Sequence, residues 1–221
     1  NAPFLVFNDA DLDKVVDGAL IAKYRNSGQT CVCANRIYVQ SGVVDQFAEK
    51  LVKATQALKV GDGMGEGVAI GPLVDKAGLA KVEEHVSDAT SKGATVLTGG
   101  KRSELGGTFY EPTVMKGVKE GMKILSEETF GPVAPIISFD TVDEGIAMAN
   151  STEFGLAAYF YSRDLSTVWK VSEELESGMV GVNTGLISTA EAPFGGIKSS
   201  GLGREGSKYG MDEFLEIKYV C

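Results

Sequence analysis

Two of the three cysteines of this 221-residue chain stand almost side by side, in the stretch SGQTCVCANR at positions 27–36. Only Val32 separates Cys31 from Cys33, and the third cysteine, Cys221, ends the chain. Such a pair could bind a metal, form a disulfide or present one reactive thiolate, because the thiolate is both the nucleophilic and the metal-binding form of cysteine.

A metal site is the least favoured of these three uses. It needs about four ligands of suitable geometry, and the chain offers three cysteines and a single histidine, His85. The Cys-x-Cys spacing also differs from the Cys-x2-Cys spacing of zinc knuckles. We therefore expect no metal here.

A cysteine–histidine dyad would have to use His85, which lies in the polar stretch KVEEHVSD. A solvated histidine on the surface of a helix is the simpler interpretation of that context. Any activation of a cysteine is then expected from a helix N-terminus, from backbone amides or from a nearby cation.

Two glycine-rich stretches have the composition of phosphate-binding loops but not their context. GDGMGEG at 61–67 follows a helical pattern rather than a strand, and no strand precedes GLGREG at 201–206. Only 15 residues follow the second stretch, too few for a βαβ unit with its acidic ribose ligand. The sequence therefore predicts no dinucleotide-binding domain within these residues.

The stretch SEETFGPVAP at 126–135 places two acids before Phe130 and a Gly131–Pro132 turn. One interpretation is the entrance to a strand, with both carboxylates solvated. The other is a carboxylate held at a sheet edge, where it could accept hydrogen bonds from sugar hydroxyls. The spacing leaves both interpretations open.

The elements that must position these residues alternate between helical and strand periodicity, which predicts an α/β layer architecture. The final strand has no following partner, so it could pair at a sheet edge, including that of another subunit. Helices are expected at 10–26 (capped by Asn8 and ended by Gly28), 44–58, 76–91, 143–150 and 165–176, and strands at 37–39, 94–97, 110–114, 134–139, 157–161, 179–182 and 214–220.

The composition of the chain argues against several classes of binding partner. The formal net charge of −9 argues against non-specific binding of nucleic acid, and an anionic substrate would need a local cation. No apolar run is long enough for a membrane span. Three cysteines cannot build a secreted disulfide framework, so we expect a reducing, cytoplasmic location.

Taken together, these stretches resemble the aldehyde dehydrogenase superfamily over essentially the whole chain. The resemblance implies an open twisted, largely parallel sheet with helices on both faces, a catalytic domain at 1–208 and an oligomerisation strand at 209–221 in a homodimer or homotetramer. It rests on GQTCVCANR, GPLVD at Gly71, GGTFYEPTV at Gly106, EETFGPVAP, NSTEFGLAA at Asn150 and APFGGIKSSGLGREG at Ala192, in that order.

The resemblance assigns the central chemistry to Cys31. Its thiolate would attack an aldehyde carbon, and its backbone N–H would be one donor to the resulting oxyanion. Hydride would pass to NAD or NADP, leaving a thioester that water hydrolyses. Glu128 falls on the carboxylate that holds the nicotinamide ribose, and Phe130 on an aromatic that positions that end of the cofactor.

RNSGQTCVC, VGVNTGLIS and the C-terminal stretch look most like the succinate-semialdehyde members, with glutarate-semialdehyde members close behind. By this resemblance Arg25 and Ser188 would bind the distal carboxylate of a semialdehyde, and Phe194 would line its channel. Without the resemblance, Arg25 is a cation at a helix C-terminus and Phe194 is a core residue.

The resemblance also implies that the general-base glutamate and most of the cofactor site precede Asn1, so the chain alone is expected not to turn over. Cys33 is either a small packed residue or a redox partner that masks Cys31 in a strained disulfide. A thiol-based redox or acyl-transfer module and a non-catalytic interaction domain are the alternative functions.

Overall fold

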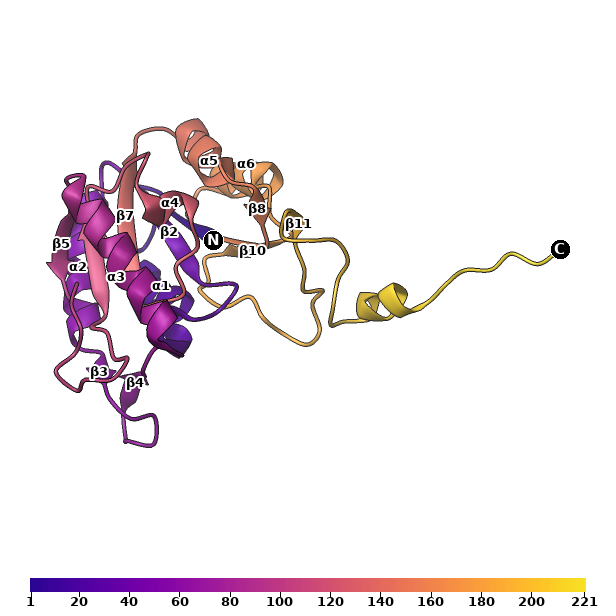
Figure 1. Cartoon of the computed structure of the whole chain (residues 1–221). Coiled ribbons are helices and arrows are strands. Elements are labelled where there is room, and N and C mark those ends of the chain that lie inside the picture. Colours follow the sequence, from indigo (N-terminus) through magenta and orange to yellow (C-terminus); the bar gives the residue numbers. More distant parts are fainter.

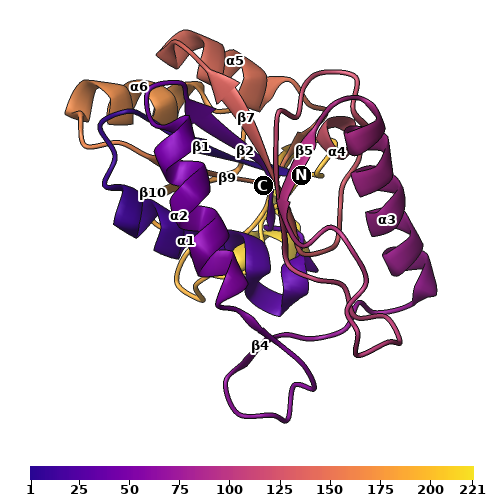
Figure 2. The ribbon, with the colours of Figure 1, turned by 90° about the vertical axis from the view of Figure 1, so that its left-hand side faces the viewer.

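A seven-stranded sheet forms the centre of the computed structural model, which describes residues 1–221. The strand order is β10-β9-β1-β2-β7-β6-β5, and every neighbouring pair is parallel except β5 and β6. The helices lie against both faces of this sheet (Figures 1 and 2). The expected α/β fold with a largely parallel sheet is therefore confirmed.

The bounds of the elements agree with the expected ones to within a few residues for most of the chain. The strands are β1 Ala2–Val6, β2 Ala34–Gln40, β3 Lys59–Val60, β4 Val68–Ile70, β5 Thr95–Thr98, β6 Thr113–Lys116, β7 Val133–Phe139, β8 Phe154–Gly155, β9 Ala157–Tyr161, β10 Met179–Val182 and β11 Ile197–Lys198. The helices are α1 Leu12–Tyr24, α2 Val44–Gln56, α3 Lys76–Ser91, α4 Lys123–Ser126, α5 Val142–Asn150 and α6 Leu165–Glu174, with 3₁₀ helices η1 Arg25–Gly28 and η2 Tyr209–Phe214. None of these helices has the length and apolar character needed to cross a bilayer.

The sheet separates two hydrophobic cores, and its strands contribute side chains to both, because successive side chains of a strand point to opposite faces. Phe4 and Val6 of β1 pack with residues of α1 and α2, whereas Leu5 and Phe7 pack with residues of α3, α5 and α6. Strands buried on both faces read as continuous apolar runs, as parallel strands between helix layers do. Burial on both faces fixes the position of the strands, and therefore the position of the loops that precede them.

Helix α1 begins and ends differently from the expectation. Its N-cap is Asp11 rather than Asn8, since the Asp11 carboxylate accepts from the N–H groups of Asp13 and Lys14 at 3.2 and 3.5 Å. The helix ends at Tyr24, and the expected last turn is instead η1, in which Asn26 and Ser27 have positive φ angles. The chain therefore turns sharply before it reaches Cys31.

The expected strand at 214–220 is not formed within this chain. Tyr209–Phe214 is a 3₁₀ helix, and the residues after it run away from the body without a partner strand (Figure 1). The alternation of apolar and charged residues was the basis of that prediction. It has no sheet edge to pair with inside the chain, and large apolar side chains such as Ile217, Tyr219 and Val220 remain exposed.

Candidate active site

The cysteine pair lies at the amino-terminal edge of the central strands. Cys31 and Cys33 occupy the turn between η1 and β2, closed by a hydrogen bond from Cys33 N–H to the Thr30 carbonyl at 3.1 Å. A second tether crosses the sheet, because the Tyr159 hydroxyl donates to the Val32 carbonyl at 2.8 Å. The turn is thus held from both sides.

The segment before the turn is held against a neighbouring loop at 71–74. The hydroxyl of Ser27 donates to the Gly71 carbonyl at 3.1 Å, and the Gln29 amide nitrogen donates to the Pro72 carbonyl at 3.2 Å. Such contacts over-determine the left-handed conformations of Asn26 and Ser27, which would otherwise cost free energy. Backbone strain of this kind gathers at functional sites.

Gly28 joins the cysteine loop to the loop that carries Glu128 and Phe130. The Gly131 N–H donates to the Gly28 carbonyl at 3.1 Å. Gly28 has a φ of +75°, and a Cβ on it would lie 2.1 Å from the Gly131 oxygen. Only glycine fits this approach. The structure therefore brings together the two loops that the sequence singled out.

The two cysteines are unequal. Cys31 is exposed, and its backbone N–H donates to no acceptor in the chain. Cys33 is 1% exposed, and its thiol donates to the Lys23 carbonyl at 3.1 Å. Both are free thiols in this structure. An exposed thiol beside an unused N–H is the arrangement that a nucleophile with an oxyanion donor requires.

Lys23 is a buried cation close to this site that sequence reasoning missed. Its side chain is fully excluded from solvent, and its ammonium donates to the Asn35 amide oxygen at 2.8 Å. Burial lowers the pKa of Lys23, while Cys33 and Glu128 act in the opposite direction. Position 23 belongs to the apolar face of α1 along with Ala19 and Ala22, a placement that could have indicated its burial.

Glu128 and Phe130 both present their side chains partly to solvent, at 41% and 42% exposure. The Glu128 carboxylate also accepts from the nitrogen of Asn1 at 3.1 Å. An accessible carboxylate and an accessible aromatic on one short loop suit the ribose and ring of a nicotinamide, since the first accepts hydroxyl protons and the second offers a flat apolar face. These residues fit that end of a dinucleotide cofactor.

His85 is not the solvated surface histidine that its polar neighbours predict. Its side chain is 0% exposed, and its two ring nitrogens face the Thr129 hydroxyl at 2.7 Å and the Glu127 carboxylate at 3.3 Å. The polar sequence neighbours of His85 did not indicate its burial, because the side chain lies on the inner face of α3 with Val82, Val86 and other buried residues. It has no contact with a cysteine, so the dyad is absent.

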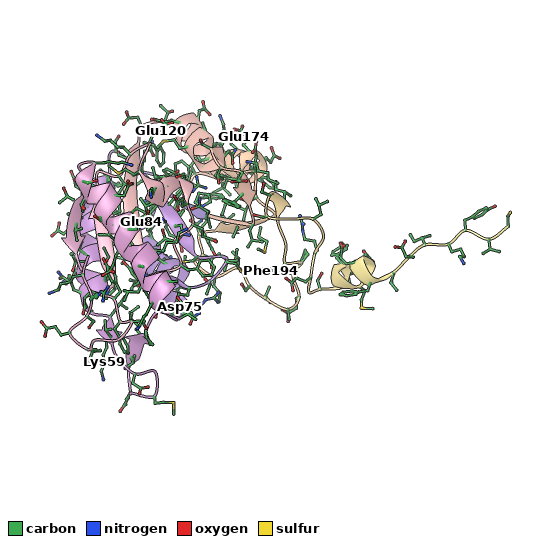
Figure 3. All side chains as sticks on the ribbon, in the orientation of Figure 1. Lys59, Asp75, Glu84, Glu120, Glu174 and Phe194 are labelled. Atoms are coloured by element: carbon green, nitrogen blue, oxygen red, sulfur yellow. The ribbon has the colours of Figure 1, made fainter.

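The three expected substrate residues lie on two segments. Arg25 is exposed at the start of η1, six residues before Cys31, and Ser188 is exposed in the segment 183–196 after β10. That segment returns along the α1 side of the sheet, with Gly185 against Gly18 and Gly195 against Gly178. Phe194, near the end of this segment, is partly buried against the core, and Figure 3 labels it on the loop that leads from the body towards the C-terminal 3₁₀ helix. Neither Arg25 nor Ser188 makes a side-chain hydrogen bond or an ion pair with another of these predicted site residues.

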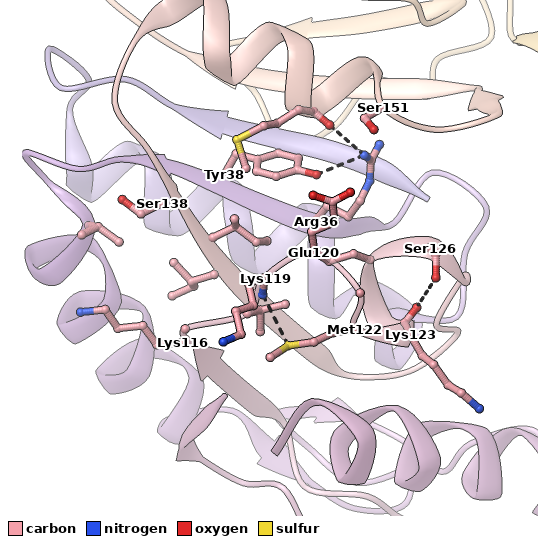
Figure 4. Close-up of a pocket in the computed structure, with 18 residues that line it drawn as sticks. Arg36, Tyr38, Lys116, Lys119, Glu120, Met122, Lys123, Ser126, Ser138 and Ser151 are labelled. Atoms are coloured by element: carbon pink, nitrogen blue, oxygen red, sulfur yellow. Dashed lines mark hydrogen bonds between the residues drawn. The ribbon is translucent and has the colours of Figure 1, made fainter. Parts of the chain in front are cut away.

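A well-formed cavity of the chain lies elsewhere. It has a volume of about 890 Å³ over β2 and β7, between the 116–126 segment and α5, and includes none of the expected site residues (Figure 4). Arg36 lies at its inner wall, but all five of its N–H donors already bond to the Asn1, Met148 and Ala149 carbonyls and the Tyr38 hydroxyl. This guanidinium therefore holds β1 and α5 in place rather than offering a free donor.

Comparisons with known proteins show which family the chain is similar to. The sequence profile of the aldehyde dehydrogenase family matches residues 1–220. Succinate-semialdehyde dehydrogenase (NADP(+)) GabD of Escherichia coli K12 and the glutarate-semialdehyde dehydrogenase of Pseudomonas aeruginosa are each 62% identical over all 221 residues. A crystal structure of an E. coli NADP-dependent enzyme, also 62% identical, superposes on the whole chain with a TM-score of 0.98. The chain spans 46% of the length of each of these proteins.

Proposed function

Because the chain belongs to the aldehyde dehydrogenase family, we propose that it forms the thiol-bearing part of an NAD(P)-dependent semialdehyde dehydrogenase. The observation that carries this proposal is the exposed Cys31, with an unused N–H, on a loop joined through Gly28 to the loop of Glu128 and Phe130. The Cys31 thiol and the proposed cofactor-binding side chains therefore lie on two loops that contact each other.

Cys31 is the nucleophile of the proposed reaction. Its thiolate adds to the aldehyde carbon, and the electron pair of the carbonyl moves to oxygen, where the Cys31 N–H stabilises the new charge. A nicotinamide dinucleotide, when bound, accepts the hydride of the former aldehyde carbon. The resulting thioester on Cys31 is cleaved by water, which releases the carboxylic acid and restores the thiol.

Glu128 and Phe130 are the proposed cofactor residues of this chain. The carboxylate accepts hydrogen bonds from ribose hydroxyls, and the aromatic ring limits where the nicotinamide can lie. Their shared loop precedes β7 and contacts α3, so these side chains start from a rigid base. Whether NAD or NADP is used depends on contacts at the adenosine end, which these residues do not touch.

The proposed substrate is succinate semialdehyde, with glutarate semialdehyde as the alternative. Both carry a distal carboxylate, which needs a charge-assisted partner in a chain of net charge −9. Arg25 and Ser188 are proposed to bind it, and Phe194 to line the path of the methylene groups. Arg25 has no carboxylate partner within this chain, so its guanidinium is free for such a ligand.

We propose residues 1–208 as the catalytic domain and 209–221 as an assembly segment. The side chains of Ile217, Tyr219 and Val220 are largely exposed, and an extended segment with alternating apolar residues gains its hydrogen bonds by adding to a sheet edge. A second copy of the protein, in a homodimer or homotetramer, is the proposed source of that edge.

The test is an assay of the full-length protein that carries this chain. The measurement is kcat/KM for succinate and glutarate semialdehyde, with NAD and with NADP. Cys31→Ser should lower kcat by at least about a thousandfold, because sulfur is lost as the nucleophile, whereas Cys221→Ser should leave kcat unchanged. Full activity of Cys31→Ser would refute the proposal.

A further inference from the structure

We propose that His85 is a positioning residue for the cofactor carboxylate Glu128, acting through the Thr129 hydroxyl, and that this support weakens on acidification. The inference rests on the proposed function, because it takes Glu128 as a cofactor ligand. It assigns a role to the single histidine of the chain, which touches neither Cys31 nor the proposed substrate residues.

The contacts come from one face of α3. His85 Nδ1 lies 2.7 Å from the Thr129 hydroxyl, and Thr129 is itself 1% exposed. Three residues earlier on the same helix, Val82 fills the space beside Gly131, where a Cβ would lie 2.4 Å from a Val82 methyl group. Glu128 and Phe130 are therefore flanked by two residues that α3 holds. A shift of either contact would move both cofactor side chains.

The tautomer of His85 follows from its second contact. Its Nε2 faces the Glu127 carboxylate at 3.3 Å, and Lys81 contacts the same carboxylate oxygen at 3.2 Å. These partners lower the pKa of Glu127, so the carboxylate is ionised and can only accept. Nε2 must then carry the proton in neutral His85. Nδ1 is left as an acceptor, and the Thr129 hydroxyl donates to it.

Protonation of His85 would reverse this arrangement. Both ring nitrogens of an imidazolium are donors, so the Thr129 hydroxyl could no longer donate and would have to rotate to accept. Burial lowers the pKa of His85, with Lys81 acting in the same direction and Glu127 and Glu84 against it. The neutral form therefore prevails near pH 7, and the rearrangement belongs to the acidic side of that range.

The experiment measures the KM for the nicotinamide cofactor, together with kcat, from pH 5.5 to 8.5 in the full-length protein. Thr129→Val removes the hydroxyl but keeps the shape, and Thr129→Ser restores it. Thr55→Val is the matched control, because Thr55 is equally buried but lies on α2 against the other sheet face. Glu128→Gln tests the assignment of the carboxylate itself.

We expect the cofactor KM of the unmodified protein to rise as His85 gains its proton. In Thr129→Val it should be about fivefold higher at pH 8, the effect of one ordinary hydrogen bond, with little further rise on acidification. Thr129→Ser and Thr55→Val should follow the unmodified protein. Changes in kcat should be smaller than those in KM.

His85→Asn and His85→Gln provide a second pair of variants. Asparagine places its amide near the position of Nδ1 and can keep the Thr129 contact, whereas glutamine reaches towards Nε2 and the Glu127 contact. His85→Asn should therefore preserve the cofactor KM at pH 8 and lose its pH dependence, and His85→Gln should raise that KM.

Two results would overturn the inference. If Glu128→Gln raises the cofactor KM but Thr129→Val keeps the KM and pH profile of the unmodified protein, the positioning role is wrong and the proposed function stands. If Glu128→Gln leaves the cofactor KM unchanged, both the assignment of Glu128 and the positioning role fall together.

Discussion

The carbonyl of Gly28 accepts a hydrogen bond from the N–H of Gly131 at 3.1 Å, and this contact joins the loops that enter β2 and β7. One loop carries Cys31, and the other carries Glu128 and Phe130. Their relative position is therefore set by backbone atoms rather than by long side chains. A change at this contact should affect the Cys31 thiol and the proposed cofactor residues together.

Gly28→Ala should be far more damaging than a comparable change elsewhere. Its Cβ would meet the Gly131 oxygen at 2.1 Å, and its φ is +75°. Gly67 is the matched control, since it has a φ of +71° but nothing within 4 Å of an added Cβ. We expect Gly67→Ala to cost about 1–2 kcal/mol of unfolding free energy for the φ alone. Gly28→Ala should cost about 1–3 kcal/mol more for the overlap. Equal urea midpoints for the two variants would contradict this reading.

The three cysteines should react with iodoacetamide at different rates. Cys31 and Cys221 are exposed, whereas Cys33 is buried and bonded to the Lys23 carbonyl. Peptide mass spectrometry of the native protein should find Cys31 alkylated fastest and Cys33 protected until denaturant is added. Cys31→Ser should remove the fast phase. Rapid native labelling of Cys33 would show that the turn at 30–33 opens readily.

Arg25→Gln should impair the oxidation of aldehydes that carry a distal carboxylate and spare the oxidation of aldehydes that lack one. Loss of a hydrogen bond to a charged group costs about 1.5–3 kcal/mol, so KM for succinate semialdehyde should rise roughly ten- to a hundredfold. The KM for butanal should change little. Arg102→Gln, which removes an exposed arginine paired with Glu83, is the control. An equal loss for both aldehydes would exclude a carboxylate-binding role.

Lys23→Met should reduce the increase of the free energy of unfolding with pH on the alkaline side. Burial lowers the pKa of Lys23 below its ordinary value of 10.5. Between these two values the unfolded chain binds more protons than the folded one, so stability rises with pH there and falls as pH is lowered. Methionine removes that dependence but leaves Asn35 without its donor. Urea unfolding from pH 7 to 9.5, with exposed Lys53→Met as control, should show the difference. Parallel slopes in all three proteins would argue against a lowered pKa of Lys23 in the folded protein.

Mild peroxide should link Cys31 to Cys33. The Cys31 thiolate takes one oxygen to become a sulfenic acid, and attack by the Cys33 thiol on that sulfur releases water and closes the disulfide. Cys33 must first leave the Lys23 carbonyl, so the second step should be the slower one. Mass spectrometry should find the loss of two hydrogens, reversed by dithiothreitol and absent in Cys33→Ser. Oxidation that stops at the sulfenic acid in the unmodified protein would contradict this prediction.

Sequence periodicity predicted the regular elements because burial dominates them. Helix α3 and strands β9 and β10 have the expected bounds, since apolar spacing marks each element and a glycine lies within two residues of one end of each, at Gly93, Gly155 and Gly178. Strand β1 was missed, although its five residues are all buried, because a short apolar run at a chain end carries no periodicity. The strand expected at 214–220 does not form in the chain, because alternation alone makes no strand without a partner edge and no strand of this chain pairs with it.

The candidate site was predicted in part. The roles of Cys31, Glu128 and Phe130 come from the family resemblance and stay predictions, and the structure places their loops together. The link through Gly28 and Gly131 could not be predicted, because it joins residues about a hundred positions apart through backbone atoms. His85 was misjudged for a related reason. Its neighbours in sequence are polar, but one face of a helix can be buried while the next residue along is solvated.

Cys31 and Glu128 both lie just before strands, at the amino-terminal edge of the sheet, whereas ligands of open α/β sheets usually gather at the carboxyl edge. The carboxyl edge of β2 and β7 is thus free of the proposed chemistry. Ser41, exposed in the turn after β2, offers an attachment point for a fluorophore or a surface tether. A sensor or immobilised catalyst built there would leave the reacting end of the molecule open to solution.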